Sequence, residues 1–190
     1  MTASQSVHLR GAVRSDLPTI LMLIEALAEY ERLSHECHAS IPLLDAALFG
    51  QRPYAEVIIA DVDSVPAGFA LYFHNFSTFL AKPGIYLEDL FVRSEYRGIG
   101  IGQALLERLA QIAIERGCGR LEWSVLDWNV DAIRFYKRLG AVPQDEWTVF
   151  RVSGDDLAKL SAGTVRIDAN TRADETRQDT NSTRITGEQE

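Results

Sequence analysis

Three glycines at alternate positions, Gly98, Gly100 and Gly102, stand between a β-rich run and a strongly amphipathic predicted helix. Glycine has no Cβ, so a turn of this kind lets backbone amides approach a ligand closely. The amino end of the helix adds unpaired N–H donors and partial positive charge, and Arg97 adds a permanent cation. The turn therefore predicts a site for a phosphate or diphosphate group.

Two common nucleotide motifs do not fit this turn. In a dinucleotide fingerprint, G-x-G-x-x-G, the last glycine would fall on Gln103 or Leu105. A P-loop requires Gly-Lys-Ser/Thr, which does not follow Gly102. The glycines alone leave a purely structural turn as the alternative.

Two motifs together resemble one family. The run from Arg97 to Gly102 resembles the R/Q-x-x-G-x-G/A motif of the GCN5-related N-acetyltransferases (GNAT), which bind acetyl-CoA. The run from Asn129 through Tyr136 to Gly140 resembles the same family's N-x-x-A-x-x-F-Y-x-x-x-G element, in the same order. Other segments are similar to the diamine (spermidine/spermine and thialysine) acetyltransferase branch: Leu23–Glu31, Gly68–Phe73, Tyr86–Val92 and Phe135–Arg138.

Hydrophobic periodicity predicts alternating elements, and hence an α/β fold. A first helix is expected to begin with Asp16 as its cap and to end near Tyr30–Leu33. The GNAT resemblance implies a mixed, mostly antiparallel sheet with a V-shaped splay, flanked by helices. Expected strands are Val7–Val13, Glu56–Asp61, Ala67–His74, Tyr86–Val92, Leu121–Leu126 and Trp147–Val152, and further helices are Pro42–Phe49, Ile101–Arg116 and Asp131–Leu139.

The resemblance also implies which residues bind acetyl-CoA as co-substrate. The splayed strand would pair its backbone with the pantetheine arm, and one of its N–H groups would polarise the thioester carbonyl. The implied coenzyme-binding residues are Leu90, Phe91, Val92, Arg97, Gly98, Ile99, Gly100, Ile101, Gly102, Gln103, Asn129 and Lys137. Asn129 is also placed to cap the following helix, and Lys137 is equally consistent with a solvated helix lysine.

Catalysis is expected to be direct attack of an amine on acetyl-CoA in a ternary complex, without an acyl-enzyme. Tyr136 matches the family tyrosine that protonates the departing thiolate, although a half-buried helix tyrosine is the structural alternative. Glu88 is a candidate to relay the proton that the acceptor loses. The retained Tyr136 and Glu88 argue against a non-catalytic acyl-CoA-binding sensor.

The acceptor is expected to be a small cationic amine of the diamine or polyamine type. Residues 1–92 carry five basic and eleven acidic side chains, a net charge of −6, which favours cations. Acceptor-side positions implied by the branch are Tyr30, Glu31, Glu88, Asp89, Asp127 and Trp128. Asp127 stands where the branch has glutamate, and Leu90 where it has phenylalanine, so thialysine-like amino acids and other small amines remain alternatives. A protein-lysine acceptor is a further alternative.

Composition limits the class of protein. The chain has 190 residues, 46% of them hydrophobic, and a net charge of −8. The acidic balance argues against nucleic acid and against a polybasic membrane anchor, and no apolar run is long enough to span a bilayer. We expect a cytoplasmic protein with an acetyltransferase domain at residues 1–160 and a disordered polar tail at 161–190. The family resemblance implies a homodimer.

No metal site is expected. Cys37 and Cys118 are too few for a disulfide framework and lack the spacing of a zinc site. His35 and His38 beside Cys37 have no second cluster to complete a ligand set, and the segment is interpreted as a polar loop.

Overall fold

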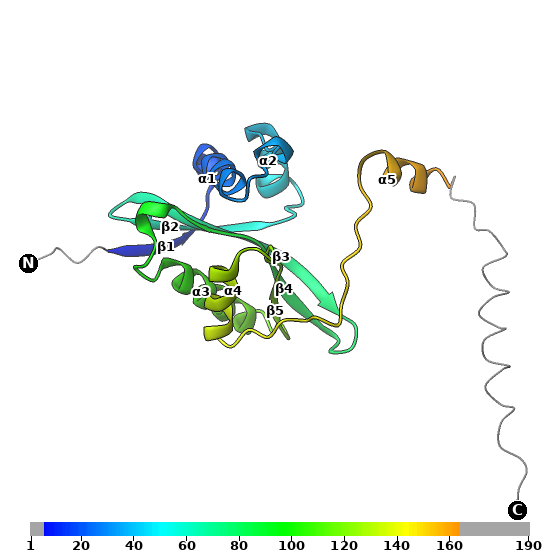
Figure 1. Ribbon diagram of the computed structural model, residues 1–190. Coiled ribbons are helices and arrows are strands. Elements are labelled where there is room, and N and C mark those ends of the chain that lie inside the picture. The colour runs from blue at the N-terminus through cyan, green and yellow to red at the C-terminus, as the bar shows by residue number, and fades with distance from the viewer. Residues whose placement is uncertain (1–5, 164–190) are drawn as a thin grey trace, which may run out of the picture. The chain divides into compact units, whose positions relative to one another are not determined.

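A five-stranded sheet forms the centre of the fold in the computed structural model, which describes residues 6–163 (Figure 1). Its strands are β1 (Val7–Gly11), β2 (Glu56–Val62), β3 (Val65–Ser77), β4 (Lys82–Val92) and β5 (Leu121–Trp123), and they lie side by side in this order. Neighbours are antiparallel except β4 and β5, which are parallel. The mixed, mostly antiparallel sheet predicted from the sequence is confirmed.

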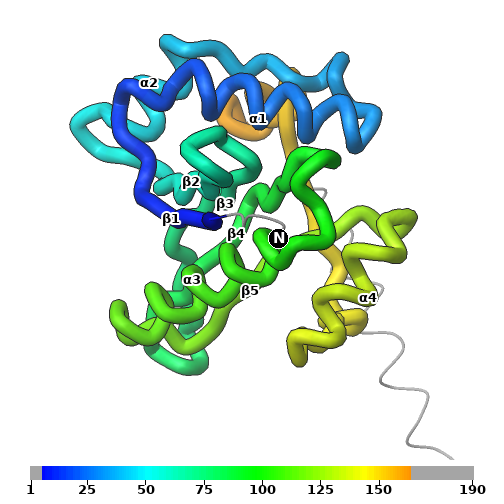
Figure 2. Tube along the Cα trace, turned by 90° about the vertical axis from the view of Figure 1, so that its left-hand side faces the viewer, coloured from blue at the N-terminus to red at the C-terminus, as the bar shows by residue number. Residues whose placement is uncertain are grey.

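Helices cover both faces of the sheet. Figures 1 and 2 show α1 (Leu17–Tyr30) and α2 (Ile41–Phe49) on one face and α3 (Ile101–Glu115) on the other. The apolar stripe of α1 packs with alternate strand residues into one core cluster that includes Ile20, Leu23, Leu27, Val57, Ile59, Phe69 and Phe91. The matching stripe of α3 buries Leu105, Leu109 and Ile112. The sheet is thus buried between helices on both faces.

Asp16 does not cap α1 as expected. No side-chain hydrogen bond reaches the first turn of α1. The carboxylate instead accepts hydrogen bonds from the Val13 N–H at 2.8 Å and from the Arg10 guanidinium at 2.7 Å. The guanidinium also donates to the other carboxylate oxygen at 3.0 Å, and this bidentate pair with Arg10 holds the carboxylate away from the helix.

The described residues fall into two compact units, one ending at Phe135 and the other beginning at Tyr136. The boundary lies within α4 (Val130–Arg138). The second unit contains α5 (Gly154–Ser161), which the sequence analysis did not predict. The predicted polar tail, residues 161–190, lies outside the described residues except for its first three positions.

The strand expected at Trp147–Val152 is wrong. These residues have no regular secondary structure, and the side chains of Trp147, Val149 and Phe150 are exposed. Alternating apolar residues indicate a strand only where a neighbouring strand can take up the backbone hydrogen bonds. Within the described part of the second unit there is no such strand.

The last part of β4 has a neighbouring strand on one side only among the described residues. Pairing with β5 covers Ile85 to Leu87 and then ends, whereas pairing with β3 continues to Val92. At the same point Tyr72 pairs with Leu87 and Leu71 with Asp89, so Glu88 is an extra residue in β4, a β-bulge. The two parallel strands therefore separate next to the segment from which the coenzyme-binding residues were predicted.

Candidate active site

The open edge of β4 presents backbone groups to a ligand. The N–H of Arg93 donates to the carbonyl of Ala67, 2.9 Å away on the β3 side. Because successive residues of a strand point their backbone groups to alternate sides, those of Leu90 and Val92 face the opposite, open edge. An extended amide-containing chain is the kind of ligand that such an edge can pair with.

The glycine turn follows directly and leads into α3. Gly98 and Gly100 have φ angles of +83° and +92°, a region that favours glycine, and no other heavy atom lies near either missing Cβ. Gly100 is the N-cap residue of α3, and no side chain caps the helix. The first amides of α3, from Ile101 to Gln103, thus have no side-chain acceptor. An anion can bind there by accepting these hydrogen bonds.

Four of the predicted site residues meet in a cluster of aromatic rings around one cation. The Arg97 guanidinium carbon lies 4.5 Å from the centroid of the Tyr30 ring and 5.7 Å from that of Phe91. The Tyr30 ring also contacts Trp128, with centroids 6.0 Å apart. These residues come from α1, β4, the glycine turn and the loop before α4. From the sequence, Arg97 and Phe91 were expected to bind the coenzyme and Tyr30 and Trp128 the acceptor, and the structure brings the four together.

Three carboxylates, those of Glu31, Glu88 and Asp89, lie near the same end of β4, and the negative charges of the first two act on the third. Burial, together with the negative charges of Glu88 and then Glu31, raises the pKa of Asp89 to about 6. Burial also raises the pKa of Glu31 above its usual range. A nearby cation stabilises the ionised form of such a carboxylate, because the cation offsets both the cost of burying the charge and the repulsion between like charges. Perturbed carboxylates of this kind often mark functional sites.

The segment after β5 contributes two further features, of which the cap by Asn129 was predicted from the sequence. The Asn129 Oδ1 accepts a hydrogen bond from the Ala132 N–H at 3.3 Å, which confirms its predicted position as a cap of α4. The ring of Phe135 lies against the glycine turn, since a methyl group built at Gly102 would lie 3.7 Å from the ring. Asp127 is exposed in the loop before α4.

Tyr136 and Lys137 follow on α4 and belong to the second unit. The side chain of Tyr136 is half-buried and that of Lys137 is exposed. The general-acid role of Tyr136 and the coenzyme contact of Lys137 therefore stay predictions.

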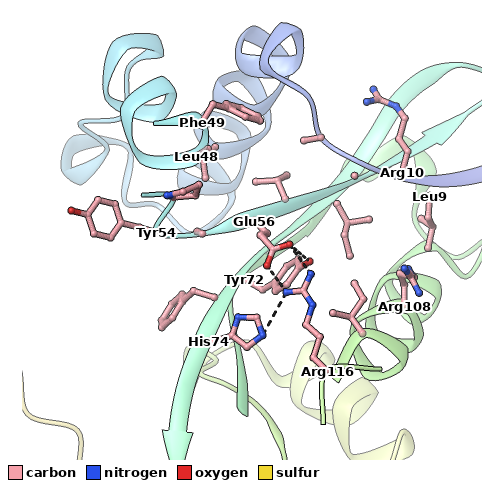
Figure 3. Close-up of a pocket in the computed structure, with 18 of the residues that line it drawn as sticks. Leu9, Arg10, Leu48, Phe49, Tyr54, Glu56, Tyr72, His74, Arg108 and Arg116 are labelled. Atoms are coloured by element: carbon pink, nitrogen blue, oxygen red, sulfur yellow. Dashed lines mark hydrogen bonds and ion pairs between the residues drawn. The ribbon is translucent and has the colours of Figure 1, made fainter. Parts of the chain in front are cut away.

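A separate cavity of about 890 Å³ lies elsewhere in the first unit, lined by residues of β1, α2, β2, β3 and α3. In Figure 3 the side chains of Glu56, Tyr72, His74 and Arg116 point toward one another inside it. A hydrogen bond from Arg116 lowers the pKa of Glu56, and burial beside Glu56 raises that of Tyr72 to about 12. None of the predicted site residues lines this cavity. Among its charged groups, Arg116 pairs with Glu56 and Arg108 pairs with Glu115.

Three features of the site escaped the sequence analysis: the bulge at Glu88, the contact of Phe135 with Gly102, and the stacking of Arg97 on Tyr30. The stacking of Arg97 on Tyr30 joins residues 67 positions apart in the chain, and no local sequence pattern indicates it.

Among the described residues no group of three or more His, Cys, Asp or Glu side chains is placed to bind a metal ion. No helix in the described part of the chain has the length and apolar character needed to cross a bilayer.

Comparison with known proteins identifies the family. Residues 21–141 match the model of the Acetyltransferase (GNAT) family. The chain is 39% identical to thialysine N-epsilon-acetyltransferase from Bos taurus, covering 82% of this chain and 97% of that protein. It is 35% identical to L-ornithine N5-acetyltransferase from Arabidopsis thaliana, covering 80% and 87% of the two chains.

A solved structure agrees with these matches. An integron cassette protein from the mobile metagenome of V. cholerae superposes with a TM-score of 0.71 at 31% identity, covering 83% of this chain and 99% of that one. The chain thus belongs to the GNAT family of acetyltransferases.

Proposed function

We propose that this protein transfers the acetyl group of acetyl-CoA to a primary amine of a small cationic acceptor. The observation that carries the proposal is the one-sided end of β4, which leads directly into the uncapped amino end of α3. The strand edge suits the amides of a pantetheine arm, and the turn suits a diphosphate. The strand edge and the turn follow one another in the chain, and together they suit both the pantetheine arm and the diphosphate of one coenzyme.

The acceptor side carries negative charge. Burial and the negative charges of Glu88 and Glu31 raise the pKa of Asp89. Glu31 directly follows Tyr30 in the chain and Asp89 lies two residues before Phe91, and both rings belong to the aromatic cluster. Carboxylates and aromatic faces both bind ammonium groups. The relatives named above act on thialysine and on ornithine, which are amino acids with a side-chain amine. These relatives support an acceptor of the same chemical class.

The chemistry requires a neutral amine and a stabilised leaving group. Glu88 or Asp89 receives a proton from the acceptor ammonium, directly or through water, and the freed nitrogen attacks the thioester carbonyl carbon. A backbone N–H on the open edge of β4 stabilises the oxyanion. The C–S bond then breaks and the Tyr136 hydroxyl protonates the thiolate. The attacking nitrogen gives up its second proton, which returns through solvent to the Tyr136 phenolate, and the neutral amide is left. Asn129 and Lys137 contact the coenzyme, and Asp127 faces the acceptor.

We further propose that the enzyme is a homodimer, as its resemblance to the diamine acetyltransferases implies, and that it is cytoplasmic, as expected from its composition. Size-exclusion chromatography with light scattering tests the oligomeric state, and the mass of two chains is expected.

Thiol release from acetyl-CoA tests the function. The acceptor panel is spermidine, putrescine, thialysine and ornithine, with the neutral amide acetamide as a control. We expect thiol release that depends on at least one cationic amine and a product with one added acetyl group by mass spectrometry. An acyl-CoA sensor would bind acetyl-CoA but release no acceptor-dependent thiol with any amine of the panel, and that outcome contradicts the proposal.

A further inference from the structure

Arg97 is held at two places in this structure. Its guanidinium lies over the Tyr30 ring, 4.5 Å from the centroid, and its Nε donates a hydrogen bond to the Val92 carbonyl at 2.8 Å. The second contact is on the open edge of β4, where Val92 turns its backbone groups away from β3. The side chain thus spans from the strand edge to the aromatic cluster of Tyr30, Phe91 and Trp128.

The aromatic cluster is reachable from solvent. Tyr30 is 38% exposed and Trp128 is 52% exposed, so a dissolved cation has access to their rings. Phe91 is buried beneath and completes the cluster, with its centroid 6.4 Å from that of Tyr30. Aromatic faces attract cations of any kind, whether a guanidinium or an ammonium group.

We propose that the aromatic cluster is the subsite for an acceptor ammonium group, and that the Arg97 guanidinium competes for it until coenzyme A draws Arg97 away. The inference rests on the proposed function and adds a coupling between its two substrates. A single ring face holds one cation at close range, so the guanidinium over Tyr30 and a substrate ammonium there exclude each other.

Coenzyme A competes for both attachments of Arg97. The diphosphate offers a charge-assisted partner to the guanidinium at the start of the glycine turn, and such pairs are stronger than an exposed cation–π contact. A pantetheine amide N–H on the open edge of β4 competes for the Val92 carbonyl. Neither attachment includes a carboxylate partner that would hold Arg97 against this competition.

The neighbouring charges favour an ammonium group once the guanidinium has left. Glu31 follows Tyr30 directly at the end of α1, and Asp89 lies two residues before Phe91 in β4. Burial raises the pKa of Glu31, and burial together with the negative charges of Glu88 and Glu31 raises that of Asp89. Coenzyme A and the acceptor are therefore expected to strengthen each other's binding by the same factor.

Calorimetry of the wild type and two variants tests the coupling between coenzyme A and the acceptor amine. The dissociation constants of spermidine and thialysine are measured with and without saturating coenzyme A, which carries no acetyl group and so allows no turnover. The test variant is Arg97→Met. The control is Arg93→Met, because Arg93 also lies over a ring, 5.4 Å from the centroid of Tyr96, and donates to a backbone carbonyl, that of Pro66. Melting curves establish that both variants are folded.

Coenzyme A is expected to tighten binding of at least one of the two amines about fivefold in the wild type, the factor that corresponds to releasing one exposed cation–π contact. The Arg93→Met control should show the same factor. In Arg97→Met the amine should bind without coenzyme A about as tightly as it binds the wild type with coenzyme A, and the coupling should fall below twofold.

A fivefold coupling that persists in Arg97→Met overturns the inference, as does amine binding to the wild type that is independent of coenzyme A. Binding of neither amine also overturns it. Failure of the proposed function is a separate result, namely no acceptor-dependent acetylation with any amine of the thiol-release panel. Acetylation of amines at a normal rate without coupling through Arg97 would support the proposed function and contradict the inference about Arg97.

Discussion

Leu87 of β4 pairs with Trp123 of β5, and this pair is the last between the two strands. One residue later the bulge at Glu88 shifts the register of β4 against β3. A bulge bends its strand and increases the local twist. The bend lies where β4 leaves its parallel neighbour, so one irregularity accounts for the open edge that continues to Val92.

Gly100→Ala is expected to weaken coenzyme A binding at least about tenfold, equivalent to 1.4 kcal/mol. Gly100 has a φ of +92°, which costs a residue with a Cβ about 1–2 kcal/mol, and the methyl group would stand where the diphosphate approaches the amides of α3. The dissociation constant is measured by calorimetry.

Gly117→Ala is the matched control for strain. Gly117 has a φ of +67° just beyond the other end of α3, and its missing Cβ also faces open space. Both variants should lower the melting temperature, but only Gly100→Ala should weaken binding. Equal dissociation constants for the two variants would show that the turn does not hold the coenzyme.

Tyr136→Phe is expected to lower turnover at least about tenfold, or 1.4 kcal/mol of activation free energy, while coenzyme A binding is retained. The phenol is proposed to protonate the departing thiolate, and phenylalanine cannot do so. Steady-state kinetics over a range of pH checks this. Tyr54→Phe removes a hydroxyl from a tyrosine that is 80% exposed and should have no effect. Wild-type turnover of Tyr136→Phe at every pH would exclude the tyrosine from the mechanism.

Asp89 links acceptor binding to pH. Its pKa is raised to about 6 by burial and by Glu88 and Glu31, so the free protein carries this charge only above that pH. Affinity for spermidine, which stays cationic throughout, should rise as the pH increases from 5 to 7. Asp89→Asn should weaken binding at pH 8 about tenfold, since a hydrogen bond to a charged group contributes about 1.5–3 kcal/mol. Calorimetry at a series of pH values measures this.

Stability should change in the opposite direction. The pKa of Asp89 is higher in the folded chain than in the unfolded chain, so the fold binds this proton more tightly and is more stable when the carboxyl is protonated. The free energy of unfolding therefore falls as the pH rises from about 4 to about 6. Asp89→Asn should therefore melt at a higher temperature than the wild type at pH 8 and at the same temperature near pH 4. Glu29→Gln, which changes an exposed carboxylate of α1, is the control. A lower melting temperature for Asp89→Asn at pH 8 would contradict the account.

Elements with their own local signals were predictable from the sequence. The helix that became α3 carries a clear apolar stripe, and glycines flank both its ends, Gly100 as N-cap and Gly117 beyond its last turn. The strands of the hairpin β3–β4 were predicted too short, because the residues near its tip, such as Phe76 and Lys82, have no alternation that separates strand from turn. Their pairing depends on the opposite strand.

Features that depend on distant partners were not predictable. The run Trp147–Val152 alternates like a strand, but without a neighbouring strand in its unit it has no regular structure. The carboxylate of Asp16 stands in a capping position, yet Arg10 draws it away from the helix. The glycine turn was located correctly, whereas the position of its Arg97 over Tyr30 follows only from the packing of α1 beside β4.

Amide hydrogen exchange, followed residue by residue by NMR with and without coenzyme A, tests the account most directly. The Ile85 amide already donates to the Arg120 carbonyl at 3.0 Å, so its exchange should be slow and unchanged. The amides of Leu90, Val92 and the first turn of α3 should exchange fast in the free protein and at least about tenfold more slowly with coenzyme A. Protection that appears elsewhere, or none at these residues under saturating coenzyme A, would contradict the assignment of this edge and turn as the coenzyme site.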